Sequence, residues 1–379
     1  MAGIYIHIPF CKQACHYCNF HFSTVLKQKS EILTAIQQEI KMRKDYVGGE
    51  KLKSVYFGGG TPSILEISEI EKLLQLIRSE YSLTSDCEIT IEGNPDDLTK
   101  DKLEEYKYMG VNRLSIGIQS FLEDELVFMN RSHDVDQAFA CLENAKASGF
   151  LNINMDLIFG SPLQSIADWE YNLQQFINFE IAHLSCYALT IEPKTVFHHR
   201  IAKKTMKPLD DKKQANQFLL ARKMLLADGY EQYEISNYAK NKLYAIHNTN
   251  YWRGEKYLGV GPSAHSYNGM TRQWNISNNS MYIKAIHEGT TYFQIETLKP
   301  SDSYNEYVMT SLRTIWGCNV AVIEKIHAKY AKHFFEKIQA KLSEGLIIKK
   351  AEAYCLSETG MLFADGIAAD LFVDDIEYD

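Results

Sequence analysis

The sequence lacks the patterns that would place the chain across a membrane or on bulk nucleic acid. None of its 379 residues belongs to an apolar run long enough to cross a bilayer. The opening segment, MAGIYIHIPF, has neither the basic nor the long apolar part of a signal peptide. Lys and Arg total 40 against 48 Asp and Glu, a net charge of −8, whereas bulk nucleic-acid binding needs a basic surface. We therefore expect a cytoplasmic protein that binds no nucleic acid and associates with membranes at most peripherally.

Internal repeats and low-complexity tracts are also absent from the sequence. The hydrophobic fraction of 45% and the charged fraction of 23% are ordinary for a globular protein. A chain of this length exceeds one typical domain, so we expect one large domain and one small one. A protein of this size can bury a sizeable core without disulfide or metal supports.

Short β-rich runs alternate with amphipathic runs through the first half of the chain. The candidate strands are Gly3–Ile8, Ser54–Phe57, Glu88–Glu92, Arg113–Gly117, Ile153–Phe159 and His183–Leu189. The candidate helices are Lys29–Met42, Ile67–Glu80, Asp101–Met109, Val135–Ser148 and Ser165–Asn178. This order favours right-handed crossovers and a parallel sheet. Six such units predict an α/β fold with a partial (β/α)₆ barrel, since the complete TIM barrel has eight.

The texture of the sequence changes near residue 200 and again near residue 300. A charged linker over Ala202–Lys213 precedes a helix at Gln214–Ala227, and Glu231–Tyr267 is rich in Tyr, Asn, His and Gly. We therefore predict a barrel over residues 1–200, a linker with a second motif-bearing segment over 201–300, and a small domain over 301–379.

The small C-terminal domain is predicted to be α+β. Its helical runs lie near Ser303–Ile315, Val320–Ala328 and Phe334–Glu344, and a β-hairpin follows at Leu346–Lys350 and Ala353–Leu356. Helices followed by a hairpin resemble a winged helix. Many winged helices bind DNA, but this segment ends in the acidic run DLFVDDIEYD, which argues against that role.

Three of the eight cysteines crowd together as Cys11-x₃-Cys15-x₂-Cys18, directly after the first candidate strand. Because disulfides are rare in the cytosol, the crowding indicates a metal site or redox chemistry. Structural zinc takes four ligands, and His16 or His21 would have to complete such a set. A [4Fe–4S] cluster normally takes four thiolates, so three cysteines leave one iron open to a small molecule. The remaining cysteines are expected to be small buried apolar residues: Cys87, Cys141, Cys186, Cys318 and Cys355.

The C-x₃-C-x₂-C pattern after the first strand of a β/α barrel resembles the signature of radical SAM enzymes. In that family the open iron binds S-adenosylmethionine (SAM), and reduction of the cluster cleaves SAM to methionine and a 5′-deoxyadenosyl radical. The run Gly58-Gly-Gly-Thr-Pro62 after the second strand resembles the family motif that meets the SAM amine with backbone groups. Taken alone, that run is a turn before a helix.

A longer ordered set of segments narrows the resemblance. It comprises YxHIPFC from Tyr5, YFGGGTP from Tyr56, EGNP from Glu92, SIGIQSF from Ser115, NRSH from Asn130 and DLIFG from Asp156. The set resembles the radical SAM group formed by the oxygen-independent coproporphyrinogen III oxidase HemN and its paralogue HemW. The resemblance implies a [4Fe–4S] cluster held by Cys11, Cys15 and Cys18. It also implies a SAM site lined by Tyr5, Tyr17, Gly59, Gly60, Thr61, Glu92, Gln119, Arg131 and Asp156.

Three features separate the two members of this group. The oxidase pattern carries a fourth cysteine two residues after the third, where this chain has Phe20. The oxidase also has an N-terminal extension before the cluster, whereas only ten residues precede Cys11 here. The run HNTNYW from His247 matches the H-N-x-x-Y-W motif associated with HemW. The resemblance therefore implies a haem chaperone that delivers haem to acceptor proteins such as respiratory enzymes. The alternative is a radical enzyme that decarboxylates coproporphyrinogen III to protoporphyrinogen IX, and Phe20 argues against that oxidase activity.

His247 and His265 are the candidate haem contacts, because neutral imidazole is a common axial ligand of haem iron. The aromatic side chains of Tyr251, Trp252 and Tyr257 are suited to pack on a flat porphyrin. Each of these residues has a structural alternative: a hydrogen-bonded histidine, core packing, or a turn in the GVGPSAHS run. A homodimer is also among our expectations for this chain.

Overall fold

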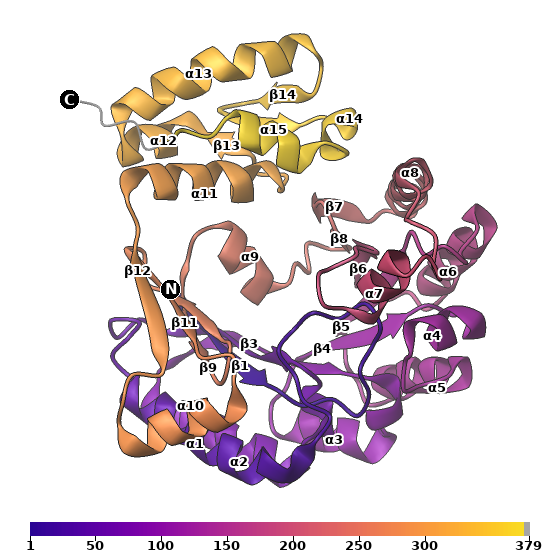
Figure 1. Cartoon of the computed structure of the whole chain (residues 1–379), viewed down its shortest axis with the longest axis vertical. Coiled ribbons are helices and arrows are strands. Elements are labelled where there is room, and N and C mark those ends of the chain that lie inside the picture. The colour runs from indigo at the N-terminus through magenta and orange to yellow at the C-terminus, as the bar shows by residue number, and fades with distance from the viewer. Residues whose placement is uncertain (375–379) are drawn as a thin grey trace.

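A computed structural model describes residues 1–374, so the last five residues of the acidic C-terminal run lie outside the described part. Its main feature is a curved sheet with the strand order β12-β11-β10-β9-β1-β2-β3-β4-β5-β6-β8-β7 (Figure 1). The strands of this sheet are β1 (Ala2–Ile8), β2 (Leu52–Gly59), β3 (Leu83–Gly93), β4 (Arg113–Gln119), β5 (Asn152–Phe159), β6 (His183–Ala188), β7 (Glu231–Glu234), β8 (Asn237–Ala239), β9 (Lys256–Val260), β10 (His265–Tyr267), β11 (Thr271–Asn275) and β12 (Phe293–Thr297).

Helices cover the convex face of this sheet (Figure 1). They are α1 (Lys29–Met42), α2 (Ile67–Glu80), α3 (Lys100–Tyr108), α4 (Glu123–Met129), α5 (Val135–Ala147), α6 (Ile166–Asn178), α8 (Asp211–Ala227) and α10 (Asn279–Glu288). The short helix α7 (Val196–Ala202) lies instead against the cysteine loop, where the amide of Phe197 donates to the carbonyl of His16 at 3.1 Å. Short 3₁₀ turns occupy Leu26–Gln28, Pro62–Ile64 and Pro95–Asp97. The order of strands and helices confirms the predicted α/β barrel-like fold, with β1 to β6 parallel throughout.

Side chains alternate between the two faces of each strand, so one face of the sheet packs in the core and the other can line a site. Ile4, Ile6 and Ile8 of β1 are fully buried in the main hydrophobic core. The residues between them, Tyr5 and His7, point to the opposite, concave face, as the period of two requires. The helices present matching apolar stripes, such as Ile70, Leu73, Leu74 and Ile77 of α2. The concave face is therefore left for polar and aromatic side chains.

The sheet extends beyond the six predicted strands at both edges. β9 adds in parallel to β1, and β10 to β12 continue antiparallel from it. At the other edge β8 pairs antiparallel with β6, and β7 with β8. The partial barrel is thus the centre of a larger, mixed sheet.

The short helix α9 (Ile246–Trp252) lies between the sheet and the C-terminal part (Figure 1). Its first amides, those of Ile246 and His247, each donate to the carboxylate of Glu88 at 3.0 Å. Glu88 pairs with Ser54 near the amino ends of the strands. The helix therefore closes the end of the barrel opposite to the cysteine loop.

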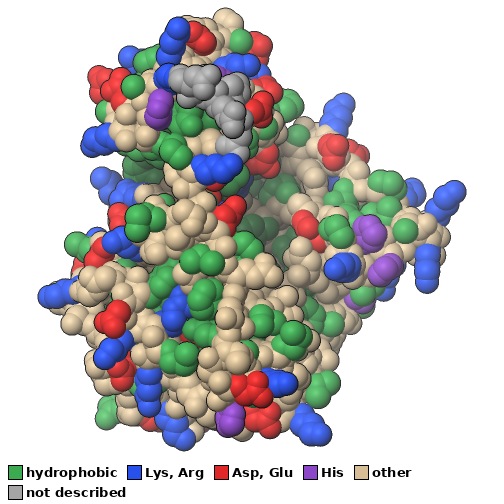
Figure 2. Space-filling view, turned by 60° about the vertical axis from the view of Figure 1, so that its left-hand side comes forward, with side chains coloured by type: hydrophobic (Ala, Val, Ile, Leu, Met, Phe, Trp, Pro, Cys, Tyr) green, Lys and Arg blue, Asp and Glu red, His purple; other side chains and the backbone are tan. Residues whose placement is uncertain are grey.

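The C-terminal part has a second core, which Tyr304, Val308, Phe334 and Ile338 help to form. It contains α11 (Pro300–Leu312), β13 (Cys318–Asn319), α12 (Val320–Ile326), α13 (Ala328–Ser343), β14 (Ile347–Lys350), β15 (Ala353–Leu356), α14 (Glu358–Met361) and α15 (Ala364–Asp370). The expected hairpin is present as β14 and β15, and β13 joins it. Figure 2 shows a recess beneath this part in which hydrophobic side chains gather. Within residues 1–374, no helix has the length and apolar character that a membrane crossing requires.

Candidate functional site

Cys11, Cys15 and Cys18 lie in the loop after β1, at the carboxyl end of the parallel strands. All are free thiols that remain partly exposed. The amide of Cys18 donates to the carbonyl of Cys15 at 3.2 Å, which fixes a tight turn. Burial raises the pKa of Cys11 to about 12 and that of Cys18 to about 11. Both are therefore neutral thiols until a bound cation replaces the proton.

A continuous set of hydrogen bonds joins this loop to the ends of β2 and β3. Thr61 Oγ1 donates to Cys11 Sγ at 3.4 Å, and Asn94 Nδ2 donates to Thr61 Oγ1 at 3.5 Å. Arg131 Nη2 donates to Asn94 Oδ1 at 2.6 Å, while its Nη1 donates to Cys15 Sγ at 3.2 Å. The structure thus brings two of the cysteines, Thr61 and Arg131 into one site. Asn94, within the EGNP segment, was missed as a site residue although the segment itself was recognised.

Arg131 is a fixed positive charge beside the cysteine loop. Its Nη1 also donates to the Tyr17 hydroxyl at 3.2 Å, and its Nη2 to the Gly117 carbonyl at 2.9 Å. A guanidinium carries five N–H donors. Of those on Arg131, Nε is the one that finds no partner among residues 1–374. One N–H is therefore left for an anionic group of a ligand.

Gly59 and Gly60 present bare backbone at the end of β2. Gly59 has a φ of +107°, which favours glycine. A Cβ on Gly60 would lie 2.5 Å from the carbonyl oxygen of Phe10, and one on Gly59 would lie 2.5 Å from the ring of His7. The close packing of this segment on the end of β1 therefore depends on the absence of side chains.

Glu92 and Asp156 place two carboxyl groups on the concave face. Glu92 accepts from the Tyr56 hydroxyl at 2.7 Å and from the Gly59 amide at 3.2 Å. Asp156 accepts from Asn154 Nδ2 at 2.7 Å. Burial raises the pKa of both carboxyl groups. The pKa of Glu92 is about 7, and the nearby charge of Asp156 contributes to that rise. A cationic ligand beside them would favour their ionised forms.

Gln119 and Tyr5 complete the concave face near these groups. Gln119 ends β4 with a φ of 67°, a left-handed conformation that is uncommon for a residue with a Cβ and is enriched at functional sites. Tyr5 is hydrogen-bonded to His7 Nδ1 at 3.3 Å, and its ring lies 6.0 Å from that of Tyr56. Strand alternation therefore brings Tyr5, Tyr56 and Glu92 together.

His16 and His21, which the zinc alternative would use, are hydrogen-bonded elsewhere. His16 Nδ1 is bonded to the Phe128 carbonyl at 2.9 Å, and His21 Nε2 to Asn279 Oδ1 at 2.8 Å. Across residues 1–374, no three or more His, Cys, Asp or Glu side chains, those of the cysteine loop included, converge to hold one metal ion, whereas an iron–sulfur cluster binds each thiolate at a separate iron atom.

His247 lies at the closed end of the barrel, away from the cysteine loop. It is 1% exposed, with Nδ1 bonded to Ser54 Oγ at 2.8 Å and Nε2 to the Tyr251 hydroxyl at 2.6 Å. Burial lowers its pKa to about 3, so the ring is neutral and has a single nitrogen lone pair. That lone pair already accepts a hydrogen bond. A bond to iron would therefore require His247 to break its hydrogen bond with Ser54 or with Tyr251.

His265 differs from His247 in being exposed, on β10, where its ring lies 6.3 Å from that of Trp274. In the described part of the chain, no hydrogen bond or ring contact joins His265 to His247. The structure therefore places the two candidate histidines apart.

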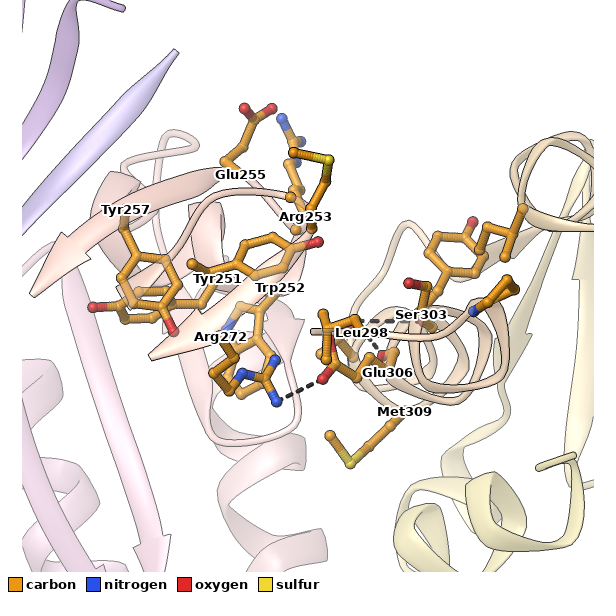
Figure 3. Close-up of a pocket in the computed structure, with 18 of the residues that line it drawn as sticks. Tyr251, Trp252, Arg253, Glu255, Tyr257, Arg272, Leu298, Ser303, Glu306 and Met309 are labelled. Carbon is orange, nitrogen blue, oxygen red and sulfur yellow. Dashed lines mark hydrogen bonds and ion pairs between the residues drawn. The ribbon is translucent and has the colours of Figure 1, made fainter. Parts of the chain in front are cut away.

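The aromatic residues of the second motif line a pocket of about 700 Å³. Tyr251, Trp252 and Tyr257 form one wall of it, and α11 forms the other (Figure 3). The sequence suggested the aromatic wall but not its partner, because contact between α9 and α11 depends on tertiary packing.

Residues 5–175 match the Radical SAM superfamily. Over 371 residues the chain is 34% identical to a Bacillus subtilis protein named "Heme chaperone HemW", covering 97% of this chain and 98% of that one. The chain belongs to the HemW family.

Another HemW, from Escherichia coli, is 38% identical over 266 residues, which are 69% of each chain. The solved structure of Escherichia coli coproporphyrinogen III oxidase, HemN, matches with a TM-score of 0.84 at 24% identity and covers 98% of this chain and 90% of its own. That identity shows a shared fold. The resemblance stated from the sequence motifs is thereby confirmed, and the HemW fold is the radical SAM fold.

The radical SAM superfamily, to which HemW proteins belong, implies a [4Fe–4S] cluster and SAM, and the residues present fit both. Three thiols stand on one loop, and thiolate is the usual ligand of iron–sulfur clusters. Beside them lie bare glycine backbone, a guanidinium with a free Nε and the partly buried carboxyl groups of Glu92 and Asp156. These groups complement the amine, the carboxylate and the positive charge of SAM.

Proposed function

We propose that this protein is a haem chaperone of the HemW type, which binds haem and transfers it to acceptor proteins. The full-length likeness to HemW, at 34% identity over 97% of the chain, carries this proposal. Phe20 supports it, because the oxidase pattern has its fourth cysteine at that position. The Phe20 side chain is 68% exposed and offers no ligand atom. The competing function, oxidation of coproporphyrinogen III, has only the shared fold in its favour.

In this proposal Cys11, Cys15 and Cys18 hold the cluster, and SAM binds beside them. When bound, the cluster and SAM supply one-electron chemistry that side chains cannot. The chain positions SAM with Tyr5, Tyr17, Gly59, Gly60, Thr61, Glu92, Gln119, Arg131 and Asp156. The carboxylates suit the ribose hydroxyls and the sulfonium, Arg131 suits the SAM carboxylate, and the backbone at Gly59 and Gly60 suits the amine.

The remaining assignments extend this proposal. His247 contributes to the haem site through Tyr251, which it holds by a 2.6 Å hydrogen bond. His265 stays a prediction as a haem contact. We also propose the division into residues 1–200, 201–300 and 301–379, a cytoplasmic location with at most peripheral membrane contact, transfer to acceptors such as respiratory enzymes, and a homodimer.

A paired assay separates the two functions. The protein is reconstituted anaerobically with iron and sulfide, then titrated with haem, and a second sample receives coproporphyrinogen III, SAM and a reductant. Stoichiometric haem binding without protoporphyrinogen supports the chaperone. Multiple turnovers to protoporphyrinogen IX would refute it.

Cysteine variants test the cluster separately from the fold. Cys15→Ala should lose the iron and sulfide of the reconstituted protein, because only two thiolates remain. Cys87→Ala is the matched control, since Cys87 is 7% exposed and belongs to the main core. Equal iron contents in the two variants would contradict the cluster assignment, and zinc in place of iron would favour the zinc alternative.

A further inference from the structure

The pocket beneath the C-terminal part has one aromatic wall, in which the rings of Tyr251 and Tyr257 meet edge to face at 73°. The rings of Tyr251 and Tyr257 lie 4.5 Å apart, and that of Tyr267 lies 6.3 Å from Tyr257. Burial raises the pKa of Tyr257 to about 12 and also raises that of Tyr267, so both phenols are neutral. Trp252 Nε1 is buried and has no partner among the described residues. The wall therefore offers a large apolar surface to a flat ligand.

The opposite wall is α11, and an ion pair spans the space between the walls. Arg272 Nη1 of β11 lies 2.5 Å from Glu306 Oε1 of α11, and Figure 3 shows this pair meeting across the pocket. Arg253 lies at the same pocket, with its guanidinium carbon 4.2 Å from the ring centre of Trp316. A ligand carboxylate can therefore compete with Glu306 for Arg272, and Arg253 lines another part of the same pocket.

No histidine is among the described residues that line this pocket. The soft donors are the thioethers of Met270 and Met309, which are 71% and 43% exposed. Thioethers bind haem iron, yet both of these belong to flexible exposed side chains. His247 stands behind the wall and reaches the pocket only through its bond to Tyr251.

The volume of about 700 Å³ falls within the range of pockets that hold cofactor-sized ligands. Haem is flat and apolar and carries two propionate carboxylates at one edge. Its ring can pack on the face of one tyrosine and against the edge of the next, and its two carboxylates have Arg272 and Arg253 as cationic partners in the lining.

We propose that haem is carried in this pocket, with its ring against the Tyr251 and Tyr257 wall and a propionate on Arg272 in place of Glu306, and without an iron–histidine bond. This proposal rests on the proposed chaperone function and names the site for it. A porphyrin held by packing and carboxylate contacts can leave without breaking a strong iron bond. Displacement of Glu306 also loosens the contact between β11 and α11.

The test titrates the full chain with haem and, separately, with iron-free protoporphyrin IX, by absorbance and tryptophan fluorescence. Both probes should bind with affinities within about tenfold, because the iron contributes little. Arg272→Gln should weaken both about tenfold, the effect of one charge-assisted hydrogen bond. Glu306→Gln should strengthen both several-fold because the competing carboxylate is gone, and a gain of affinity cannot arise from misfolding. Lys332→Gln is the control, since Lys332 pairs with Glu336 at 3.9 Å and both side chains are exposed.

The outcomes separate the pocket from the function. Haem binding that is unchanged in both Arg272→Gln and Glu306→Gln would refute this pocket as the haem site but would not refute the chaperone function. Tight haem binding without protoporphyrin binding would refute the pocket too, because the iron bond would then dominate. Failure of the unaltered protein to bind haem at all refutes the chaperone function itself.

Discussion

Glu88→Gln is the substitution that most directly tests how the motif helix α9 is held. Glu88 is 3% exposed and accepts from the amides of Ile246 and His247, both at 3.0 Å. Its Oε2 also lies 3.9 Å from Nε of Arg113, which is 1% exposed. Nε and Nη1 of Arg113 have no hydrogen-bond partner in the described part of the chain. One carboxylate thus caps the helix and neutralises a buried cation.

The magnitude follows from these two roles. Glutamine has one carbonyl oxygen, so one of the two amide bonds to a charged acceptor is lost, at about 1.5–3 kcal/mol. The substitution also leaves the Arg113 charge without its partner, and breaking a buried pair in this way costs about 3–5 kcal/mol in all. Both costs arise from removing the same negative charge, so they are not summed. We expect the free energy of unfolding to fall by about 4 kcal/mol.

Urea unfolding measures this change, and a double-mutant cycle isolates its cause. Arg113→Gln removes the cation, so the double variant should be less destabilised than the sum of the single variants, by at least 1 kcal/mol or so. Glu104→Gln is the control, because Glu104 is an exposed partner of Lys100 at 3.8 Å and should change stability by less than about 0.5 kcal/mol. A Glu88→Gln protein as stable as this control, or strictly additive effects in the cycle, would refute the reasoning.

Three further predictions follow from single sites. Gly60→Ala should lower the iron content after anaerobic reconstitution, because its Cβ would meet the Phe10 carbonyl at 2.5 Å, whereas Gly366→Ala, with nothing within 4 Å, should not. Since burial raises the pKa of Glu92 from 4.5 to about 7, its contribution to stability is present below pH 4.5 and is lost as the pH rises through 7. Glu92 should therefore contribute a loss of about 3 kcal/mol over that window in urea unfolding of the ligand-free protein, and Glu92→Gln should lose that much less than the unaltered protein. Tyr108→Lys, at an 88% exposed tyrosine, should leave the unfolding midpoint unchanged.

Periodicity in the sequence was sufficient for the central barrel. The boundaries predicted for Lys29–Met42 and Ile67–Glu80 agree with α1 and α2, because each helix buries one apolar stripe on the sheet. Strand ends were less well defined. Asp156 lies within β5 and is followed by three more residues of that strand, since backbone pairing with β6 continues beyond the site.

The strands at the edges of the sheet show no comparable periodicity in their sequences. β9 pairs in parallel with β1 across some 250 residues of sequence, and β12 is exposed along most of its length. Neither strand shows a strict alternation, because β9 is buried on both faces toward its end and β12 on neither. Such pairings depend on tertiary context, which no local window of sequence contains.

The order of residues in the sequence does not reveal that the cysteine-loop motifs and the HNTNYW motif are in contact. They lie at opposite ends of the same strands, and side chains connect them. Glu92, at the cysteine end, accepts from Tyr56, whose ring stacks on His247 at 5.0 Å. His247 in turn holds Tyr251, which lines the pocket. Three side chains therefore span the distance from a proposed SAM contact to the proposed haem pocket. Contiguity alone is not coupling. It becomes coupling only if the charge of Glu92, which a bound cation would change, alters the packing that the haem wall depends on.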